Sequence, residues 1–494
     1  VMIAMENNMQ NLINSLAEGN KKNVYIFYFF LIMLTFSPVI FFSYAFSDDW
    51  STFFDAITRN GSSFQWDVQS GRPVYAVFRY YGQMLINDIS SFSYLRLFNI
   101  LSLVVLSGFI YNFIDSRKIF DNPVFKVIFP LLICLLPAFQ VYASWATCFP
   151  FTISVLLAGI SYNKCFPHSK QRSSLPEKLA SIVVLWVAFA IYQPTAITFL
   201  FFFMLDSCIK KESSLTVKKV ATCFIILVIG VAGSFIMSKV LPVWLYRESL
   251  SRAELTADIG GKMKWFINES LINAVNNYNI QPVKIYSWFS SLAILIGLYT
   301  ILVGKSGRWK TFIVIAIGIG SYAPNLATKE NWAAFRSLVA LELIISTLFL
   351  IGINSLVSRI FKQAFVWPLI ALTIMIIAQY NIINGFIIPQ RSEIQALAAE
   401  ITNKIPKNYT GKLMFDLTDP AYNAFTKTQR YDEFGNISLA APWALKGMAE
   451  EIRIMKGFNF KLSNNVIISE TNRCIDDCMV IKTSDAMRRS TINY

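Results

Sequence analysis

Two adjacent carboxylates follow the first long apolar run of the chain, in the stretch Phe46-Ser47-Asp48-Asp49-Trp50. The run before them, Val24–Phe46, contains no charged residue over 23 positions, which is long enough for a helix that crosses a bilayer. Acids directly beyond such a helix cannot lie in hydrocarbon, so they face water at the membrane surface or a cavity there. The polar, aromatic-rich segment that follows, 47–94, is long for a connector between membrane helices, and long ordered loops are usually functional.

Composition places the chain among polytopic membrane proteins. Hydrophobic residues make up 55% of its 494 residues and charged residues only 15%, whereas soluble proteins carry about 25% charged residues. The net charge is +14, but the basic residues fall in short clusters between apolar runs. This pattern is typical of the cytoplasmic connectors of membrane proteins and not of a nucleic-acid-binding surface. We therefore expect a lipid bilayer, and no nucleic acid, as a partner.

Hydropathy predicts eleven transmembrane helices in a membrane domain that spans residues 1–388. They are expected at Val24–Phe46, Leu95–Ile114, Val124–Tyr142, Ala146–Tyr162, Leu179–Tyr192, Thr195–Ser207, Val217–Leu241, Ile285–Val303, Thr311–Asn325, Ala334–Val357 and Ala364–Ile388. The fifth and sixth form either a hairpin or one kinked helix, because Gln193-Pro194 divides them. The even-numbered connectors are short and basic, while the two long loops, 47–94 and 242–284, are odd-numbered. This alternation predicts a cytoplasmic N-terminus and an external C-terminus.

Residues 389–494 have the composition of a soluble domain. Acidic residues alternate there with short apolar runs, and two of these runs, Gly411–Leu417 and Val466–Ser469, are expected to be strands. Gln395–Ile405 and Ala440–Met455 have a helical pattern. The fold class predicted for the chain is therefore a polytopic α-helical membrane protein with a small C-terminal α/β domain outside the membrane.

Two of the seven cysteines, Cys474 and Cys478, fall in this C-terminal domain. A disulfide between them fits an oxidising compartment, and the alternative is two free thiols in a turn. No metal site is expected, because two cysteines without a nearby histidine cannot complete a zinc shell.

The candidates for acid–base chemistry are carboxylates, because the chain has one histidine and no nucleotide-binding glycine motif. Asp48 and Asp49 come first, since like-charge repulsion raises the pKa of one member of an adjacent pair. The helix end expected just before them adds negative potential. The pair therefore predicts a general base at one of the two positions. The alternative is that the pair only ends the helix at the membrane surface.

Cations for a phosphate group are predicted at three positions. Arg72 lies in the same loop as the acid pair, and Lys329 and Arg336 lie around the connector between the ninth and tenth expected helices. An arginine at headgroup depth suits a phosphate. The alternative for Lys329 and Arg336 is that their side chains only extend from the membrane surface into water.

Three further residues are secondary site candidates. Glu330 belongs to the polar segment that contains Lys329. Glu342 lies six residues beyond Arg336, about 9 Å into the membrane in a regular helix, and is either functional or a structural partner of Lys239. Trp50 is a candidate for stacking on a sugar ring, with an aromatic belt at the interface as the commoner explanation.

The combination resembles a known family of membrane enzymes. An Asp-Asp pair just outside the first span, Arg72-Pro73 later in the same loop, about ten further spans and a terminal external domain are similar to polyprenol-dependent glycosyltransferases of the GT-C type. Within them, the chain most resembles the serotype-converting O-antigen glucosyltransferases of temperate phages and prophages. The likeness is strongest over Phe46–Tyr81 and weak over Pro389–Tyr494.

The resemblance implies a fold, a reaction and a location. The donor would be undecaprenyl-phosphate glucose and the acceptor a sugar of the lipid-linked O-antigen, at the periplasmic face of the bacterial inner membrane. Asp48 or Asp49 would deprotonate the acceptor hydroxyl, which attacks the anomeric carbon with inversion, and basic residues would hold the departing lipid phosphate. No cofactor is implied, and nothing in the sequence indicates a divalent metal.

Two other functions fit many of the same features. An O-antigen polymerase also has many spans and large external loops, but it is expected to rely on arginines in those loops. A lipid-linked-sugar flippase or transporter is expected to show internal repeats and ionisable residues at the middle of the membrane. The sequence shows no repeat, and only Glu342 approaches that depth.

Overall fold

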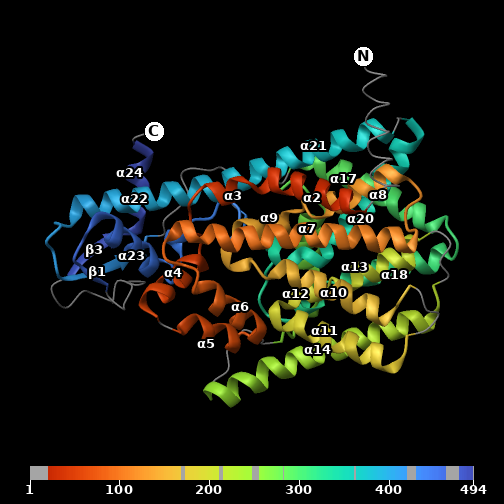
Figure 1. The fold of residues 1–494 in the computed structure, drawn as a ribbon, viewed down its shortest axis with the longest axis horizontal. Coiled ribbons are helices and arrows are strands. Elements are labelled where there is room, and N and C mark those ends of the chain that lie inside the picture. Colours follow the sequence, from red (N-terminus) through yellow and green to blue (C-terminus); the bar gives the residue numbers. More distant parts are fainter. Residues whose placement is uncertain are drawn as a thin grey trace.

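The computed structural model describes residues 21–59, 61–168, 173–210, 215–247, 255–281, 283–360, 363–419, 430–462 and 478–492. Nearly all of the regular structure in these ranges is helical, and the three strands lie near the C-terminus. Figure 1 shows the helices packed along the long axis of the molecule, with the strands at one end. We call this the sheet end.

Six helices in the described ranges are long and apolar enough to cross a membrane. They are Ile89–Arg117 (η1 and α7), Ala146–Cys165 (η2 and α10), Val217–Tyr246 (α14), Lys284–Leu302 (α17), Phe335–Arg359 (within α20, Phe335–Ile360) and Phe365–Lys404 (α21 and α22). A bent pair, α8 (Pro123–Ile133) and α9 (Pro137–Ser144), adds a seventh if its two parts form one span. The chain is therefore a helical membrane protein.

The four other predicted spans are helical but shorter. They correspond to α2 (Lys21–Phe36), to α11 (Leu175–Ile191), to the succession of α12 (Gln193–Ala196), α13 (Phe199–Met204) and η3 (Leu205–Ile209), and to α18 (Gly307–Gly320). α19 (Ala323–Ala327) follows α18. Length and composition alone do not qualify these helices as spans, so the count of eleven stays a prediction.

The first apolar run does not form one helix up to the acid pair. α2 ends at Phe36, α3 (Pro38–Phe41) is a single turn, and non-helical backbone leads to α4 (Asp48–Thr58). Pro38 contributes to this break because it has no N–H for the helical ladder. The expectation that the acids follow a helix C-terminus is therefore wrong. They lie in the first turn of α4, where the helix dipole favours negative charge.

The segment 47–94 folds into α4, α5 (Ser62–Gln69), α6 (Pro73–Gln83) and the short η1 (Ile89–Ser91), before α7 (Phe92–Arg117) begins. Asp55 of α4 starts α5, because its carboxylate accepts the Ser63 N–H at 2.8 Å. Between α5 and α6, Gly71 turns the chain with a φ of +76° and lies against α14. A Cβ there would come within 2.4 Å of the Ser238 Cβ, so glycine is required both for the turn and for this packing.

The second long connector is also ordered in helices. α14 extends to Tyr246, five residues beyond the predicted end of its span, and α15 (Ile259–Trp265), η5 (Phe266–Ser270) and α16 (Leu271–Val275) lead to α17.

A single helix joins the membrane part to the sheet end. α21 (Gln363–Ile382) continues through η6 (Ile383–Ile387) into α22 (Ile388–Lys404), so the boundary predicted at residues 388 and 389 lies inside a helix. Figure 1 shows it running the length of the molecule.

A small parallel sheet follows this helix. Its order is β2-β1-β3, from Lys461–Leu462, Lys412–Asp416 and Cys478–Lys482, and it packs with α23 (Leu445–Lys456) and α24 (Thr483–Ile492). β1 and α23 fall at the predicted strand Gly411–Leu417 and the predicted helix Ala440–Met455. The predicted strand Val466–Ser469 and Cys474 lie outside the described residues. Cys478 is disulfide-bonded, and its pairing with Cys474 stays a prediction.

The sheet end shares its hydrophobic core with the first long loop. Trp50 and Phe53 of α4 share a buried cluster with Leu445 and Met448 of α23, and Figure 1 shows α23 beside α4. The backbone carbonyl of Trp50 lies so close to Gly447 that a Cβ there would come within 2.1 Å of it. The first long loop and the C-terminal residues are therefore packed as one unit.

Candidate functional site

The two acids of the first loop have different surroundings. Asp49 is completely buried, and its carboxylate accepts the backbone N–H groups of Phe46 at 3.1 Å and Thr147 at 2.9 Å. It also accepts the N–H of Ala146 at 3.3 Å and lies 3.5 Å from the guanidinium of Arg96. Burial raises the pKa of Asp49 to about 6, although Arg96 and the three N–H groups lower it. Asp49 thus connects three segments of the chain at the start of α4.

The carboxylate of Asp48, in contrast, has no partner in the described part of the chain. The side chain is half-buried, and its carboxylate makes no hydrogen bond or ion pair with any described residue. Its backbone carbonyl accepts hydrogen bonds from Ser51 and Thr52 of the same helix, and from Arg79 at 3.3 Å. A half-buried carboxylate with a fixed backbone is suited to accept a proton from a ligand.

A buried ion pair contacts the first turns of α4, where Asp48 lies. Arg79 of α6 lies 3.2 Å from Asp67 of α5, and both side chains are buried. The same guanidinium donates to Thr52 at 2.9 Å and Ser51 at 3.0 Å in the first turns of α4. Burial raises the pKa of Asp67 to about 6, against the opposing effect of Arg79. Sequence reasoning missed both residues, although an arginine within the apolar run of α6 signals a buried partner.

Arg72 is a half-buried cation of the first loop. It stands just before α6, and its guanidinium lies 4.8 Å from the centre of the Tyr192 ring. It forms no ion pair with a described residue, and its buried Nε has no hydrogen-bond partner among them. The Asp67 carboxylate interacts electrostatically with both Arg72 and Asp48. The Asp48 carboxylate and the Arg72 guanidinium therefore both lie within electrostatic range of the same buried acid.

The guanidinium of Arg336, in contrast, is already paired with acidic side chains. Its guanidinium lies between Trp145 and Trp332 and binds both oxygens of Asp432, at 2.7 Å for the first contact, and Glu433 at 3.1 Å. Glu433 also accepts the N–H groups of Phe335 and Arg336 at the start of α20. Burial raises the pKa of Glu433, with Arg336 opposing it. Arg336, which was predicted to bind a phosphate group, is thus held by Asp432 and Glu433, and sequence reasoning did not consider these two acids.

These groups converge on one region near the sheet end. The Tyr192 hydroxyl interacts electrostatically with Arg72, Arg336 and Glu433. The Cys148 thiol does so with Asp48, Asp49, Arg336 and Glu433. Tyr192 stacks on Phe151 at 4.1 Å, and Phe151 contacts Tyr142 at 5.3 Å. The Tyr142 hydroxyl interacts electrostatically with Cys148. Arg72 lies over the Tyr192 ring, and the Tyr142 hydroxyl donates to the Arg336 carbonyl at 2.7 Å. We call the three rings of Tyr142, Phe151 and Tyr192 the aromatic floor of the candidate site.

The other predicted site residues are placed differently. Glu330 is exposed, and its backbone carbonyl accepts a hydrogen bond from Lys262 at 2.6 Å. Lys329 is also exposed. Trp50 is completely buried in the core shared with α23, where no sugar reaches it.

Glu342 is buried at the bend between α8 and α9. Its carboxylate accepts the Ala138 N–H at 3.1 Å, in the first turn of α9. The alternative pairing with Lys239 is therefore wrong for the described residues, because the bend of α8 and α9 supplies the partner. The reason is local: the broken helix leaves N–H groups without an acceptor, and a buried acid satisfies one of them.

Within the described residues, no group of three or more His, Cys, Asp or Glu side chains is arranged to hold a metal ion. The five cysteines Cys134, Cys148, Cys165, Cys208 and Cys223 are free and buried. The cofactor and metal expectations stay predictions.

Comparison of the chain with protein-family models, with curated proteins and with solved structures finds no match. Its function is therefore inferred from the site itself.

Proposed function

We propose that the chain is a glucosyltransferase that uses undecaprenyl-phosphate glucose as donor. It transfers the glucosyl group to a sugar of the lipid-linked O-antigen, with inversion at the anomeric carbon, and so changes the serotype of the cell. In this proposal the eleven predicted helices cross the bacterial inner membrane, the N-terminus is cytoplasmic, and the sheet end lies in the periplasm. The proposal begins from the resemblance of Phe46–Tyr81 to such enzymes.

One observation supports the proposal most. Among the charged side chains of the candidate site, Asp49, Arg79 and Arg336 each have an oppositely charged partner. Asp48 and Arg72 make no such pair with a described residue. Leaving a half-buried charge unpaired is costly in a folded protein, so a ligand that pairs with both side chains would account for their presence in this fold. A lipid phosphate and an adjacent hydroxyl would do so.

The two charges have complementary roles in this reaction. Asp48 takes the proton of the acceptor hydroxyl while the hydroxyl oxygen attacks the anomeric carbon of the donor. The bond between that carbon and the phosphate oxygen breaks, and undecaprenyl phosphate leaves with the electron pair. Arg72 offsets the charge that develops on the phosphate. Asp49 takes no part, because its oxygens are already engaged by N–H groups and Arg96.

The test is the Asp48→Asn variant. Asparagine has the size and polarity of aspartate but does not accept the proton, so transfer is expected to fall by about 10²–10⁴-fold. Asp115→Asn is the matched control, since Asp115 pairs with Lys126 at the other end of α7. O-antigen modification is measured in cells that carry each variant at equal protein level.

Arg72→Lys refines the assignment. Lysine retains the charge but not the planar two-pronged contact with phosphate, so transfer is expected to fall less than in Asp48→Asn. Full modification by the Asp48→Asn protein would refute the catalytic role of the first loop.

A further inference from the structure

Arg79 of α6 connects two other helices of the first long loop. Its Nε donates to the Thr52 Oγ1 at 2.9 Å, and its Nη2 donates to the Ser51 Oγ at 3.0 Å and to the Asp48 carbonyl at 3.3 Å, all in α4. Its Nη1 donates to the Asp67 carboxylate of α5 at 3.2 Å. A guanidinium is planar and rigid, so it fixes its acceptors relative to one another. The first turn of α4 is therefore held in place relative to α5 and α6.

Asp67 extends this link to Arg72. Its carboxylate binds Arg79, and its backbone carbonyl accepts the Arg72 N–H at 3.0 Å, in the turn between α5 and α6. Asp48 is also held by its backbone, through its carbonyl. The ion pair of Arg79 and Asp67 thus connects the backbones of Asp48 and Arg72, and in the described part of the chain it forms no ion pair with either of their side chains.

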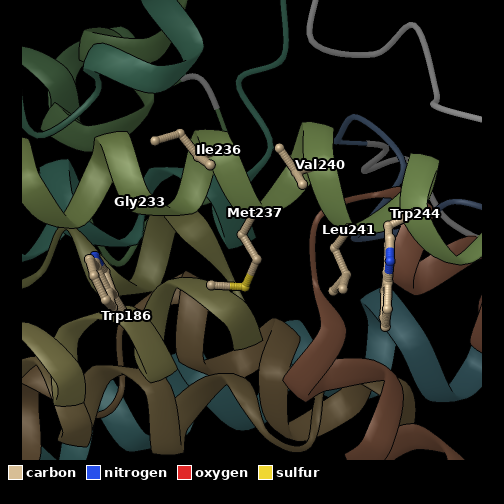
Figure 2. Close-up of a pocket in the computed structure, with 7 residues that line it drawn as sticks. All are labelled: Trp186, Gly233, Ile236, Met237, Val240, Leu241 and Trp244. Carbon is tan, nitrogen blue, oxygen red and sulfur yellow. The ribbon is translucent and has the colours of Figure 1, made fainter.

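The turn that carries Arg72 is also fixed from a second direction. A Cβ at Gly71 would come within 2.4 Å of the Ser238 Cβ of α14, and Gln193 of α12 donates to the Gly71 carbonyl at 3.2 Å. Figure 2 shows this part of α14 beside Trp186 of α11. The position of Arg72 therefore depends on these neighbouring helices as well as on α5.

The first turn of α4 is more dependent on Arg79. Asp49 holds the start of α4 to the junction of α9 and η2, and Asp55 holds its last turns to the start of α5. Among the described residues of α6, Arg79 alone forms hydrogen bonds with α4. Loss of this link is therefore expected to change the direction of the Asp48 side chain without unfolding α4.

Stability alone does not account for this ion pair. Arg79 is 5% exposed and Asp67 is 3% exposed, and a buried ion pair is often no more stabilising than apolar residues of similar size. We propose that Arg79 and Asp67 are positioning residues, which set the distance between the Asp48 carboxylate and the Arg72 guanidinium and do not touch the substrate. The inference rests on the proposed function for the roles of Asp48 and Arg72, and on the geometry for the link between them.

The double variant Arg79→Met/Asp67→Leu tests the inference in the purified full-length chain in detergent. Apolar side chains of similar size replace the ion pair, so the unfolding temperature is expected to stay close to that of the unmodified chain. The kcat for transfer from undecaprenyl-phosphate glucose to lipid-linked O-antigen is expected to fall by about 10–100-fold, because a misplacement of about 1 Å can cost about 10²-fold. The KM for the donor is expected to change little, because the turn of Arg72 keeps its contacts with Gln193 and Ser238.

Hydrogen exchange provides a readout that does not require activity. Exchange in residues 48–52 is expected to be faster in the double variant, whereas exchange in residues 68–72 is expected to be unchanged. Lys126→Met/Asp115→Leu is the matched control, because it removes an ion pair at the other end of α7. This control is expected to keep both the kcat and the exchange of residues 48–52.

The outcomes separate this inference from the proposed function. An unchanged kcat in the double variant, or unchanged exchange in residues 48–52, would refute the positioning role. An unfolding temperature far below that of the control variant would assign the ion pair to stability and would also refute it. If the unmodified chain transfers no glucose, the proposed function is refuted, while faster exchange in residues 48–52 of the double variant would still support the placement of Asp48 by Arg79.

Discussion

Two pairs of adjacent acids, Asp48-Asp49 and Asp432-Glu433, lie near the same aromatic floor but are used differently. In each pair one acid is buried and accepts backbone N–H groups: Asp49 at the α9 to η2 junction and Glu433 at the start of α20. Each buried acid also faces an arginine. The difference is in the second acid, because Asp432 completes the contact with Arg336, whereas the Asp48 carboxylate has no partner among the described residues.

The comparison separates structural acids from a candidate for chemistry. A carboxylate whose oxygens already accept several N–H groups has no lone pair directed at a ligand. Adjacency in the sequence therefore says little about which acid is available. What decides it is the set of donors that the rest of the fold brings to each carboxylate.

The largest expected effect is on folding, in the Asp49→Ala variant. The change leaves the Arg96 guanidinium, which is 1% exposed, without a counter-ion, and three N–H groups without an acceptor. Breaking a buried ion pair from one side costs about 3–5 kcal/mol, so thermal unfolding in detergent should occur at a clearly lower temperature. Asp48→Ala is the control and should unfold close to the unmodified chain. Equal losses in the two variants would remove the distinction between the acids.

A smaller effect is expected when the second pair is broken. Glu433→Ala removes the acceptor of the Phe335 and Arg336 N–H groups, and an unsatisfied buried donor costs about 1–3 kcal/mol. The variant should also become more sensitive to proteolysis near the described residues 430–438. The exposed Glu330 provides the control as Glu330→Ala, for which no change is expected. Unchanged stability and protease resistance in Glu433→Ala would show that the second pair does not hold the sheet end in place.

The smallest effect concerns pH and extends the comparison to a third buried acid, Asp67. Its pKa is about 6 in the folded chain, above the ordinary value of 3.8, so the folded state binds the proton more tightly than the unfolded state. Stability from this group is therefore present at low pH and lost as the pH rises through 6, by about 1 kcal/mol between pH 5 and pH 8. Unfolding temperatures measured across this range should fall, and less steeply in Asp67→Asn. A rise over the same range in the unmodified chain would contradict the prediction.

Much of the fold could be predicted because it depends on local patterns. The apolar runs became helices, and the alternation at Gly411–Leu417 became β1. The break at Ser37-Pro38 was also readable, since proline ends a helical ladder, but the absence of charge over Val24–Phe46 suggested one continuous helix.

The site was less predictable because its contacts are distant in the sequence. Asp49 binds residues almost a hundred positions away, at Ala146 and Thr147. Arg336 is likewise neutralised by Asp432 from 96 positions away. No periodicity links such residues, so the sequence could nominate charged groups but could not say which of them the fold would leave unpaired.

The unbroken helix from Phe365 to Lys404 also sets how far the sheet end lies from the membrane part and how it is rotated about the helix axis. Forty residues correspond to about 60 Å, roughly twice the hydrocarbon thickness of a bilayer, so this helix is longer than a membrane crossing requires. Each added residue would move the part of the chain beyond it by about 1.5 Å along the helix axis and rotate it by about 100°. Gly385 accepts the Gly435 N–H, and Glu393 accepts the N–H groups of Ser438 and Leu439. One residue inserted between Gly385 and Glu393 would turn the second contact away from the first, while seven would return nearly the same heading about 10 Å further along the axis. The number of residues in this helix is therefore constrained, because a change in it would separate the side chains and backbone groups that now contact each other.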